Sequence, residues 1–118
     1  MPTFTVSMPP STNELYANVP KIGRVKTAKY KAWTRGEMMA LVAQRARPVP
    51  WPVSIVISAP YNSRRDCDNL LKPCCDLLVN AGIIPDDSAR CVEKCTVGWT
   101  KEARGVDGVQ ITVEPITP

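Results

Sequence analysis

The sequence predicts an α/β fold of the α+β kind, with one domain over residues 1–118 and two main helices packed on a mixed four-stranded sheet. Apolar and polar residues alternate in four short segments, which is the pattern of half-buried strands. Two longer segments space their apolar residues three or four positions apart, as on one face of a helix. In chain order these segments give β-α-β-α-β-β, and helices packed on a sheet bury both kinds of apolar face.

The N-terminal half is expected to form a strand, a long loop and a helix. Residues 3–8 alternate apolar and polar side chains, which predicts a strand that Pro9-Pro10 ends. Residues 11–27 contain turn residues and basic residues without a clear period, so we expect a long loop that becomes ordered when nucleic acid binds. Residues 28–47 have the spacing of an amphipathic helix, although Gly36 weakens it, and prolines follow its end.

The C-terminal half is expected to hold three strands and the second helix. Residues 52–59 are apolar enough to form a central strand. Residues 69–81 can bury one side as a helix, and Gly82 is its expected stop. Residues 91–99 and 109–113 predict the last two strands.

Acidic residues stand on both sides of the second predicted helix. The run over residues 64–72 contains Asp66 and Asp68, and Asp86-Asp87 follows the helix. Because the helix carries the chain back, we expect Asp66, Asp68 and either Asp86 or Asp87 to meet at one end of the sheet. Carboxylates are hard oxygen ligands, and several of them at one point require a cation. Mg²⁺ is the expected ion at neutral pH.

This combination has the chemistry that phosphodiester hydrolysis needs. Bound metal ions activate a water and stabilise the leaving oxygen, and Lys72 would place a positive charge where negative charge develops. Each residue alone also has a simpler interpretation. Asp68 is a good helix N-cap, Asp86 and Asp87 are ordinary turn residues, and Lys72 can pair with Asp68 or Asp76 on an exposed helix face.

Two other classes of acidic site fit the sequence less well. A calcium EF-hand loop that starts at Asp66 would need glycine at its sixth position and glutamate at its twelfth, where Leu71 and Leu77 stand. An aspartyl-phosphate phosphatase would need a larger parallel sheet than 118 residues permit. The metal-dependent nuclease interpretation therefore remains the strongest of the three.

One segment of the chain is strongly basic. Between Lys21 and Arg47 there are eight basic residues and one acid, Glu37, in a chain whose net charge is +4. Lysine and arginine gain affinity for phosphates by displacing counterions, so the segment predicts a polyanion held beside the acidic site. The alternative is an ordinary solvated helix face.

The chain has five cysteines and no histidine. An odd number of cysteines argues against a disulfide framework, and buried free thiols are expected instead. A zinc-binding interaction module built on Cys74, Cys75, Cys91 and Cys95 is the alternative. No CxxC pair exists, however, and adjacent ligands suit a tetrahedral ion poorly, so no zinc is expected.

No apolar run is long enough to span a membrane, and the N-terminus has no charged and apolar signal segment. We therefore expect a cytoplasmic protein without a membrane partner.

The sequence resembles the RusA-type Holliday junction resolvases, endodeoxyribonucleases that are common in phages and prophages. The motifs that stand in the family's order and spacing are Arg-Asp-x-Asp-Asn-Leu-x-Lys at residues 65–72, Asp76, Ala81-Gly82 and Asp86-Asp87. A weaker match at residues 9–13 and Tyr16 extends the resemblance over nearly the whole chain.

The resemblance implies a homodimeric, Mg²⁺-dependent nuclease, with Mn²⁺ as a substitute ion, that nicks two opposed strands of a four-way DNA junction symmetrically. It implies metal-binding catalytic roles for Asp66, Asp68 and Asp87 and a catalytic role for Lys72, with Asp86 as a further candidate ligand. It also implies a bacterial host cell and a phage or prophage origin. The residues expected to hold DNA phosphates are Arg64, Arg65, Lys21, Arg24, Lys26, Lys29 and Lys31. The main alternative is a branched-DNA-binding protein of the same fold without catalytic activity.

Overall fold

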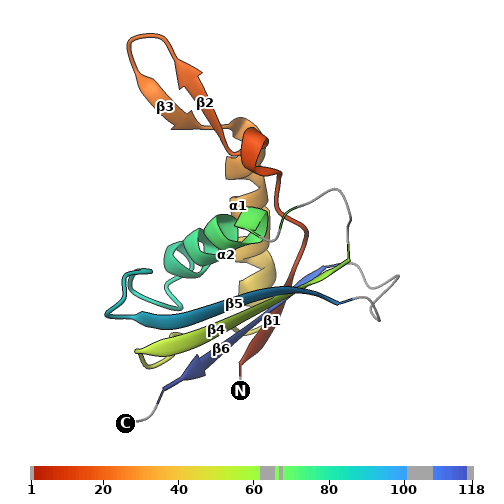
Figure 1. The fold of residues 1–118 in the computed structure, drawn as a ribbon, viewed down its shortest axis with the longest axis vertical. Helices are drawn as coiled ribbons and strands as arrows, with labels where there is room; N and C mark the ends of the chain where they lie inside the picture. The colour runs from red at the N-terminus through yellow and green to blue at the C-terminus, as the bar shows by residue number, and fades with distance from the viewer. Residues whose placement is uncertain (1, 62–65, 67, 101–107, 117–118) are drawn as a thin grey trace.

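The computed structural model describes residues 2–61, 66, 68–100 and 108–116 (Figure 1). Its elements are β1 (Thr3–Val6), the short 3-10 helix η1 (Thr12–Glu14), β2 (Tyr16–Val19), β3 (Gly23–Lys26), α1 (Ala28–Ala43), β4 (Val53–Pro60), α2 (Asp68–Asn80), β5 (Val92–Thr100) and β6 (Val109–Pro115). The predicted mixed sheet and the two main helices are confirmed. Strands β2 and β3 form a separate hairpin that the sequence did not predict.

The main sheet has the strand order β1-β6-β4-β5. Strand β4 pairs with β5 in parallel and with β6 antiparallel, and β1 pairs antiparallel with β6. The central position expected for residues 52–59 is therefore confirmed. The parallel β4–β5 pair requires a crossover, and α2 supplies it.

The core lies between one face of this sheet and the two helices (Figure 1). On β4 the alternating residues Val53, Ile55 and Ile57 are completely buried, whereas Val56 on the opposite face is 40% exposed. Strand β6 repeats the pattern with Val109, Ile111 and Val113 buried. Each fully buried Val or Ile side chain contributes roughly 1.5–3 kcal/mol, so the alternation fixes which face the helices cover.

Helix α2 packs one side against the core, and its opposite side carries polar residues. Its buried residues Leu70, Cys74, Leu77 and Leu78 have the three-to-four spacing of a helix face. At its C-terminal end the N–H of Gly82 bonds the carbonyl of Val79, and the N–H of Ile83 bonds the carbonyl of Leu78. This is a Schellman ending, and the φ of +74° at Gly82 explains why glycine stops the helix as predicted.

Helix α1 begins at a side-chain cap and is shorter than the predicted range 28–47. The backbone N–H of Tyr30 donates to Oγ1 of Thr27, the N-cap residue. The helix ends at Ala43 because Arg45 adopts a φ of 59° and turns the chain out of helical geometry. Within the part of the chain that the structure describes, no helix is both long and apolar enough to cross a membrane.

The prediction of a long loop over residues 11–27 is wrong, because η1 and the β2–β3 hairpin occupy this segment. The hairpin closes through a turn in which Pro20 sets the first central position and Lys21 has a φ of 68°. The N–H of Ile22 donates to the carbonyl of Val19 at 3.1 Å across this turn. In Figure 1 the hairpin projects beyond the N-terminal end of α1, away from the main sheet.

Candidate active site

A cavity of about 280 Å³ lies where α2, the hairpin and the loop after α2 meet. It brings together the predicted site residues Lys72, Asp86, Asp87 and Lys26, which come from three separate parts of the chain. Tyr16, Asp76, Val79 and Asn80 complete the lining. A cavity with carboxylates and ammonium groups on its walls suits a charged substrate together with a cation.

Helix geometry places three of the polar lining residues. Lys72, Asp76 and Asn80 are four positions apart and therefore share one side of α2, opposite the buried side. The expected shared face of Lys72 and Asp76 is thus confirmed. Because the Schellman ending at Gly82 reverses the chain, the loop that carries Asp86 and Asp87 lines the same cavity as this helix face.

Asp76 joins two helices through a single oxygen. Tyr30 of α1 is buried, and its hydroxyl donates a hydrogen bond of 2.8 Å to Asp76 Oδ2. The same Oδ2 lies 3.6 Å from Lys72 Nζ. The negative charge of Asp76 raises the pKa of Lys72, so Lys72 is a stable cation at neutral pH. Burial, followed by the bond to Asp76, raises the pKa of Tyr30, which keeps its proton and remains a donor.

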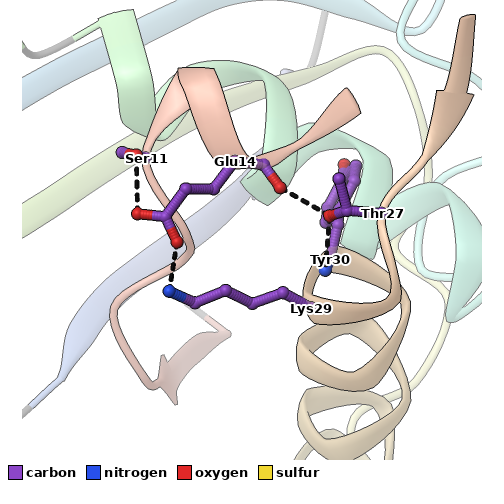
Figure 2. Close-up of polar contacts among 5 residues, drawn as sticks. All are labelled: Ser11, Glu14, Thr27, Lys29 and Tyr30. Carbon is purple, nitrogen blue, oxygen red and sulfur yellow. Dashed lines mark hydrogen bonds and ion pairs between the residues drawn. The ribbon is translucent and has the colours of Figure 1, made fainter. Parts of the chain in front are cut away.

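The base of the hairpin is fixed beside this network (Figure 2). The hydroxyl of Thr27 donates to the backbone carbonyl of Glu14 while it accepts from the N–H of Tyr30. The Glu14 carboxylate bonds the Ser11 hydroxyl at 2.9 Å and forms an ion pair with Lys29. The start of α1, which also carries Tyr30, is therefore tied to η1 at the root of the hairpin.

Asp86 is held by residues of its own turn. Its Oδ1 accepts from the backbone N–H of Ser88 at 2.9 Å and also from the Ser88 hydroxyl, and its Oδ2 lies 3.2 Å from a guanidinium nitrogen of Arg90. These hydrogen bonds, with those from Ser88 first, hold the pKa of Asp86 at about 2. Both carboxylate oxygens of Asp86 thus accept hydrogen bonds from Ser88 or Arg90. These bonds stabilise the conformation of the loop, which also carries the exposed Asp87.

The other predicted acids lie at the beginning of α2. Asp66 is exposed and its carbonyl accepts from the N–H of Asn69 at 3.1 Å, but it does not line the cavity. Asp68 is the first residue of α2, one turn before Lys72. Arg64 and Arg65 lie outside the described residues, as does the side chain of Asp68. Among the side chains that are described, no group of three His, Cys, Asp or Glu residues is arranged to hold a metal ion.

A second cavity, of about 320 Å³, adjoins the first and is basic. Lys26 and Asn80 line both cavities, and Lys31 and Arg35 line the second. Of the other cations predicted to bind DNA, Lys21 and Arg24 lie on the hairpin. Arg24 stacks its guanidinium carbon 4.1 Å from the Tyr16 ring centroid. The first cavity, which Asp76, Asp86 and Asp87 line, is called the acidic cavity below. Basic residues lie beside it on the hairpin and in the second cavity.

Several residues of the site were not selected from the sequence. The spacing of Asp76 from Lys72 was a visible signal, because residues four apart share a helix face. Arg35 was part of the basic segment but was not chosen as a site residue. Tyr30 carried no signal, because its spacing on α1 is that of a core residue and its bond to Asp76 spans 46 positions.

The described cysteines are free thiols, and Cys74, Cys75 and Cys91 are buried as expected, while Cys95 is partly buried. Burial raises the pKa of Cys74 to about 12. Cys74 packs in the hydrophobic core with the buried leucines of α2. This observation favours a packing role for the thiol.

A family model described as Endodeoxyribonuclease RusA matches residues 7–114. The match includes β2, β3, both helices and the loop that carries Asp86 and Asp87. A search of curated proteins found no significant match.

Proposed function

Because the chain belongs to the RusA family of endodeoxyribonucleases, we propose that it resolves four-way DNA junctions by Mg²⁺-dependent nicking of two opposed strands. The family acts on branched DNA, and its reaction is the hydrolysis of a phosphodiester bond. One observation carries the proposal. Asp87 and Lys72 line the same cavity, which shares Lys26 and Asn80 with a second cavity whose basic lining suits a phosphate backbone.

The kind of side chain on the cavity wall suits a hard divalent cation. Asp76, Asp86 and Asp87 line the cavity with carboxylates, the ligand type that Mg²⁺ prefers, although the described side chains alone form no group of three ligands. We expect Asp66, Asp68 and Asp87 to hold the ion, with Asp86 supporting the loop, and Mn²⁺ to be an acceptable substitute. When bound, the ion would supply charge neutralisation at the phosphate and activation of a water.

The protein's own residues orient the DNA strand and stabilise charge. Lys72 is a cation at neutral pH and pairs with Asp76, so it can stabilise the negative charge that develops on the phosphate oxygens. Lys26, Lys31 and Arg35 would hold the adjoining backbone in the second cavity. Arg64 and Arg65 precede Asp66 in sequence and are expected to grip the strand next to the site.

Symmetric cutting requires two active sites. A homodimer with two-fold symmetry would present one copy of the cavity to each of two opposed strands, which matches the symmetry of a four-way junction. Dimerisation therefore belongs to the same proposal, as does a cytoplasmic role in a bacterial host with a phage or prophage origin of the gene.

The decisive experiment compares the wild type with Asp87→Asn on a synthetic four-way junction, with Mg²⁺, with Mn²⁺ and with a chelator. We expect paired nicks from the wild type only with metal, and retained junction binding without nicks from the variant. Glu114→Gln, an exposed acid on β6, is the matched control and should cut normally. If the wild type binds junctions but cuts none with either metal, the protein is a branched-DNA-binding protein and not a nuclease.

A further inference from the structure

The tip of the β2–β3 hairpin presents an apolar side chain to solvent. Ile22 is 73% exposed and stands between the exposed basic residues Lys21 and Arg24. Figure 1 shows the hairpin extending away from the helices and the main sheet. Most of the Ile22 side chain is therefore in contact with solvent and available to a partner.

The position of Ile22 is fixed by the turn. Pro20 restricts the backbone at the first central position, and the bond from Ile22 N–H to the Val19 carbonyl, 3.1 Å long, closes the turn. Behind the tip, four register pairs run from Val19↔Gly23 to Tyr16↔Lys26. A side chain held in place before binding loses little conformational entropy when it meets a partner.

The root of the hairpin is a wall of the candidate active site. Tyr16 and Lys26, the pair farthest from the tip, both line the acidic cavity. Thr27 follows directly, and its N–H donates to the carbonyl of Leu15 at 3.0 Å, so the two ends of the hairpin are joined. A strand bound in the cavity would therefore lie against the root of the hairpin.

The charge of the hairpin selects the kind of partner. The segment 15–28 contains Lys21, Arg24 and Lys26 and no acidic residue. A cationic ribbon with an apolar tip suits either DNA or an anionic lipid surface, since both offer negative charge beside apolar groups. Continuity with a cavity that holds Lys72 and Asp87 favours DNA.

Building on the proposed function, we propose that the hairpin is a wedge that inserts Ile22 between two neighbouring bases at the branch point of the DNA. Apolar side chains inserted at a base step unstack it, and the branch point is the place where stacking is already interrupted. Lys21 and Arg24 would hold the phosphates on either side of the opened step. The hairpin thus recognises the branch, while the acidic cavity carries the chemistry.

The length of the hairpin sets the distance between the base step opened by Ile22 and the phosphate bound in the acidic cavity. Ile22 at the tip and Lys26 at the root are four residues apart in the sequence. At about 3.4 Å per residue in an antiparallel strand, this separation is roughly 14 Å. Stacked nucleotides rise by about 3.4 Å along each strand. The opened step should therefore lie within about four nucleotides of the phosphate held in the cavity.

The test uses the full chain and a four-way junction with 2-aminopurine placed at successive positions around the branch point, in a chelator so that no strand is cut. This base fluoresces more strongly when it is unstacked. We expect wild-type protein to raise the fluorescence at least about twofold at one step beside the branch. Ile22→Ser should abolish the rise while junction affinity stays within about threefold, because phosphate contacts dominate affinity. Ile22→Leu should retain it.

Val42→Ser is the matched control, because Val42 is 77% exposed on α1 and lies outside the hairpin. It should leave the fluorescence rise intact. A rise that persists in Ile22→Ser overturns the wedge but leaves the nuclease proposal standing. If Ile22→Ser instead converts a dimer to a monomer in light scattering, Ile22 is a contact between two copies and the wedge is wrong. A wild type that binds no branched DNA removes both proposals.

Discussion

Tyr30 and Asp76 are joined by a hydrogen bond of 2.8 Å from the Tyr30 hydroxyl to Asp76 Oδ2. The tyrosine ring is completely buried at the start of α1, whereas Asp76 lies on the cavity side of α2. Because Lys72 Nζ is 3.6 Å from the same oxygen, the position of an exposed ammonium group depends on a buried ring in the other helix. Tyr30 is therefore a positioning residue for Lys72.

Tyr30→Phe tests this relationship. Phenylalanine keeps the buried ring and removes only the donor, so Asp76 loses the Tyr30 hydroxyl and, among the described residues, keeps Lys72. We expect kcat for junction cleavage to fall by about five- to thirtyfold with KM within about twofold, which corresponds to roughly 1–2 kcal/mol. The free energy of unfolding should fall by about 1 kcal/mol. Single-turnover cleavage and urea unfolding measure the two effects.

Leu41→Val provides the stability control for that variant. Leu41 is buried on α1 and does not line the acidic cavity, so its truncation should cost about 1 kcal/mol of folding free energy and leave kcat unchanged. Equal losses of kcat in Leu41→Val and Tyr30→Phe would show that the tyrosine acts through overall stability alone.

The Asp86 turn predicts a pH-dependent response. Ser88→Ala removes the hydroxyl donor to Asp86 Oδ1, the first cause of its low pKa, so the pKa should rise from about 2 toward its usual value. Carbon-detected NMR titration of the Asp86 carboxyl measures the change. Because the pKa is lowered in the folded state, the contribution of Asp86 to stability is present above its unfolded pKa of 3.8 and is lost as the pH falls toward 2.

Acid unfolding gives the matching comparison. Wild type and Ser88→Ala should differ in stability above pH 3.8, and the difference should shrink and then disappear as the pH falls through 2, because Asp86 is then protonated in both proteins. An Asp86 pKa that is the same in the two proteins would contradict the role given to Ser88.

The second cavity predicts a salt-dependent contribution to binding. Lys26→Gln and Lys31→Gln remove one cation each from the wall beside the active site. Each variant should lower the slope of log affinity against log salt by about 1 and weaken junction binding at low salt. Fluorescence anisotropy over a salt series measures both quantities.

Lys94→Gln is the control for these variants, since Lys94 is exposed on β5 and lines neither cavity. It should change the slope by much less than one. If the three variants behave alike, the cavity has no special share in DNA binding, and only the net charge of the protein matters.

The main sheet was predictable because its strands encode their own faces. In β4 and β6 every second residue is apolar and buried, so the sequence contains the same alternation as the structure. The hairpin was missed for the opposite reason. Each of its strands has four residues and no buried face, and the contacts of Thr27 and Lys29 with Glu14 hold its root. Such tertiary contacts leave no periodic pattern.

The candidate site divides in the same way. Lys72 and Asp76 were expected on one face because helix geometry places residues four apart together. The bond from Tyr30 to Asp76 could not be predicted, since nothing local relates positions 46 apart. The roles of Asp66 and Asp68 at the metal stay predictions that depend on the family resemblance.

Gly108 and Gly36 form a matched pair of glycines with opposite expected effects on folding. Gly108 has a φ of +121°, and an added Cβ would lie 2.9 Å from Thr5 Cγ2 and 3.0 Å from the Val6 carbonyl oxygen. Gly108→Ala should therefore destabilise the protein by about 1–3 kcal/mol, through both backbone strain and the close contact with β1. Gly36 lies exposed inside α1, and beyond its own stretch of helix no described atom lies within 4 Å of an added Cβ.

Gly36→Ala should stabilise the protein by about 0.5–1 kcal/mol, because alanine restricts the unfolded chain and suits a helix. Urea unfolding of both variants against the wild type measures the two signs. Gly36→Ala also separates stability from activity, since α1 carries Tyr30 and a firmer helix should leave Lys72 in place and kcat unchanged. Destabilisation by both substitutions would mean that α1 is not a regular helix at Gly36, and the route by which Tyr30 positions Lys72 would then need another explanation.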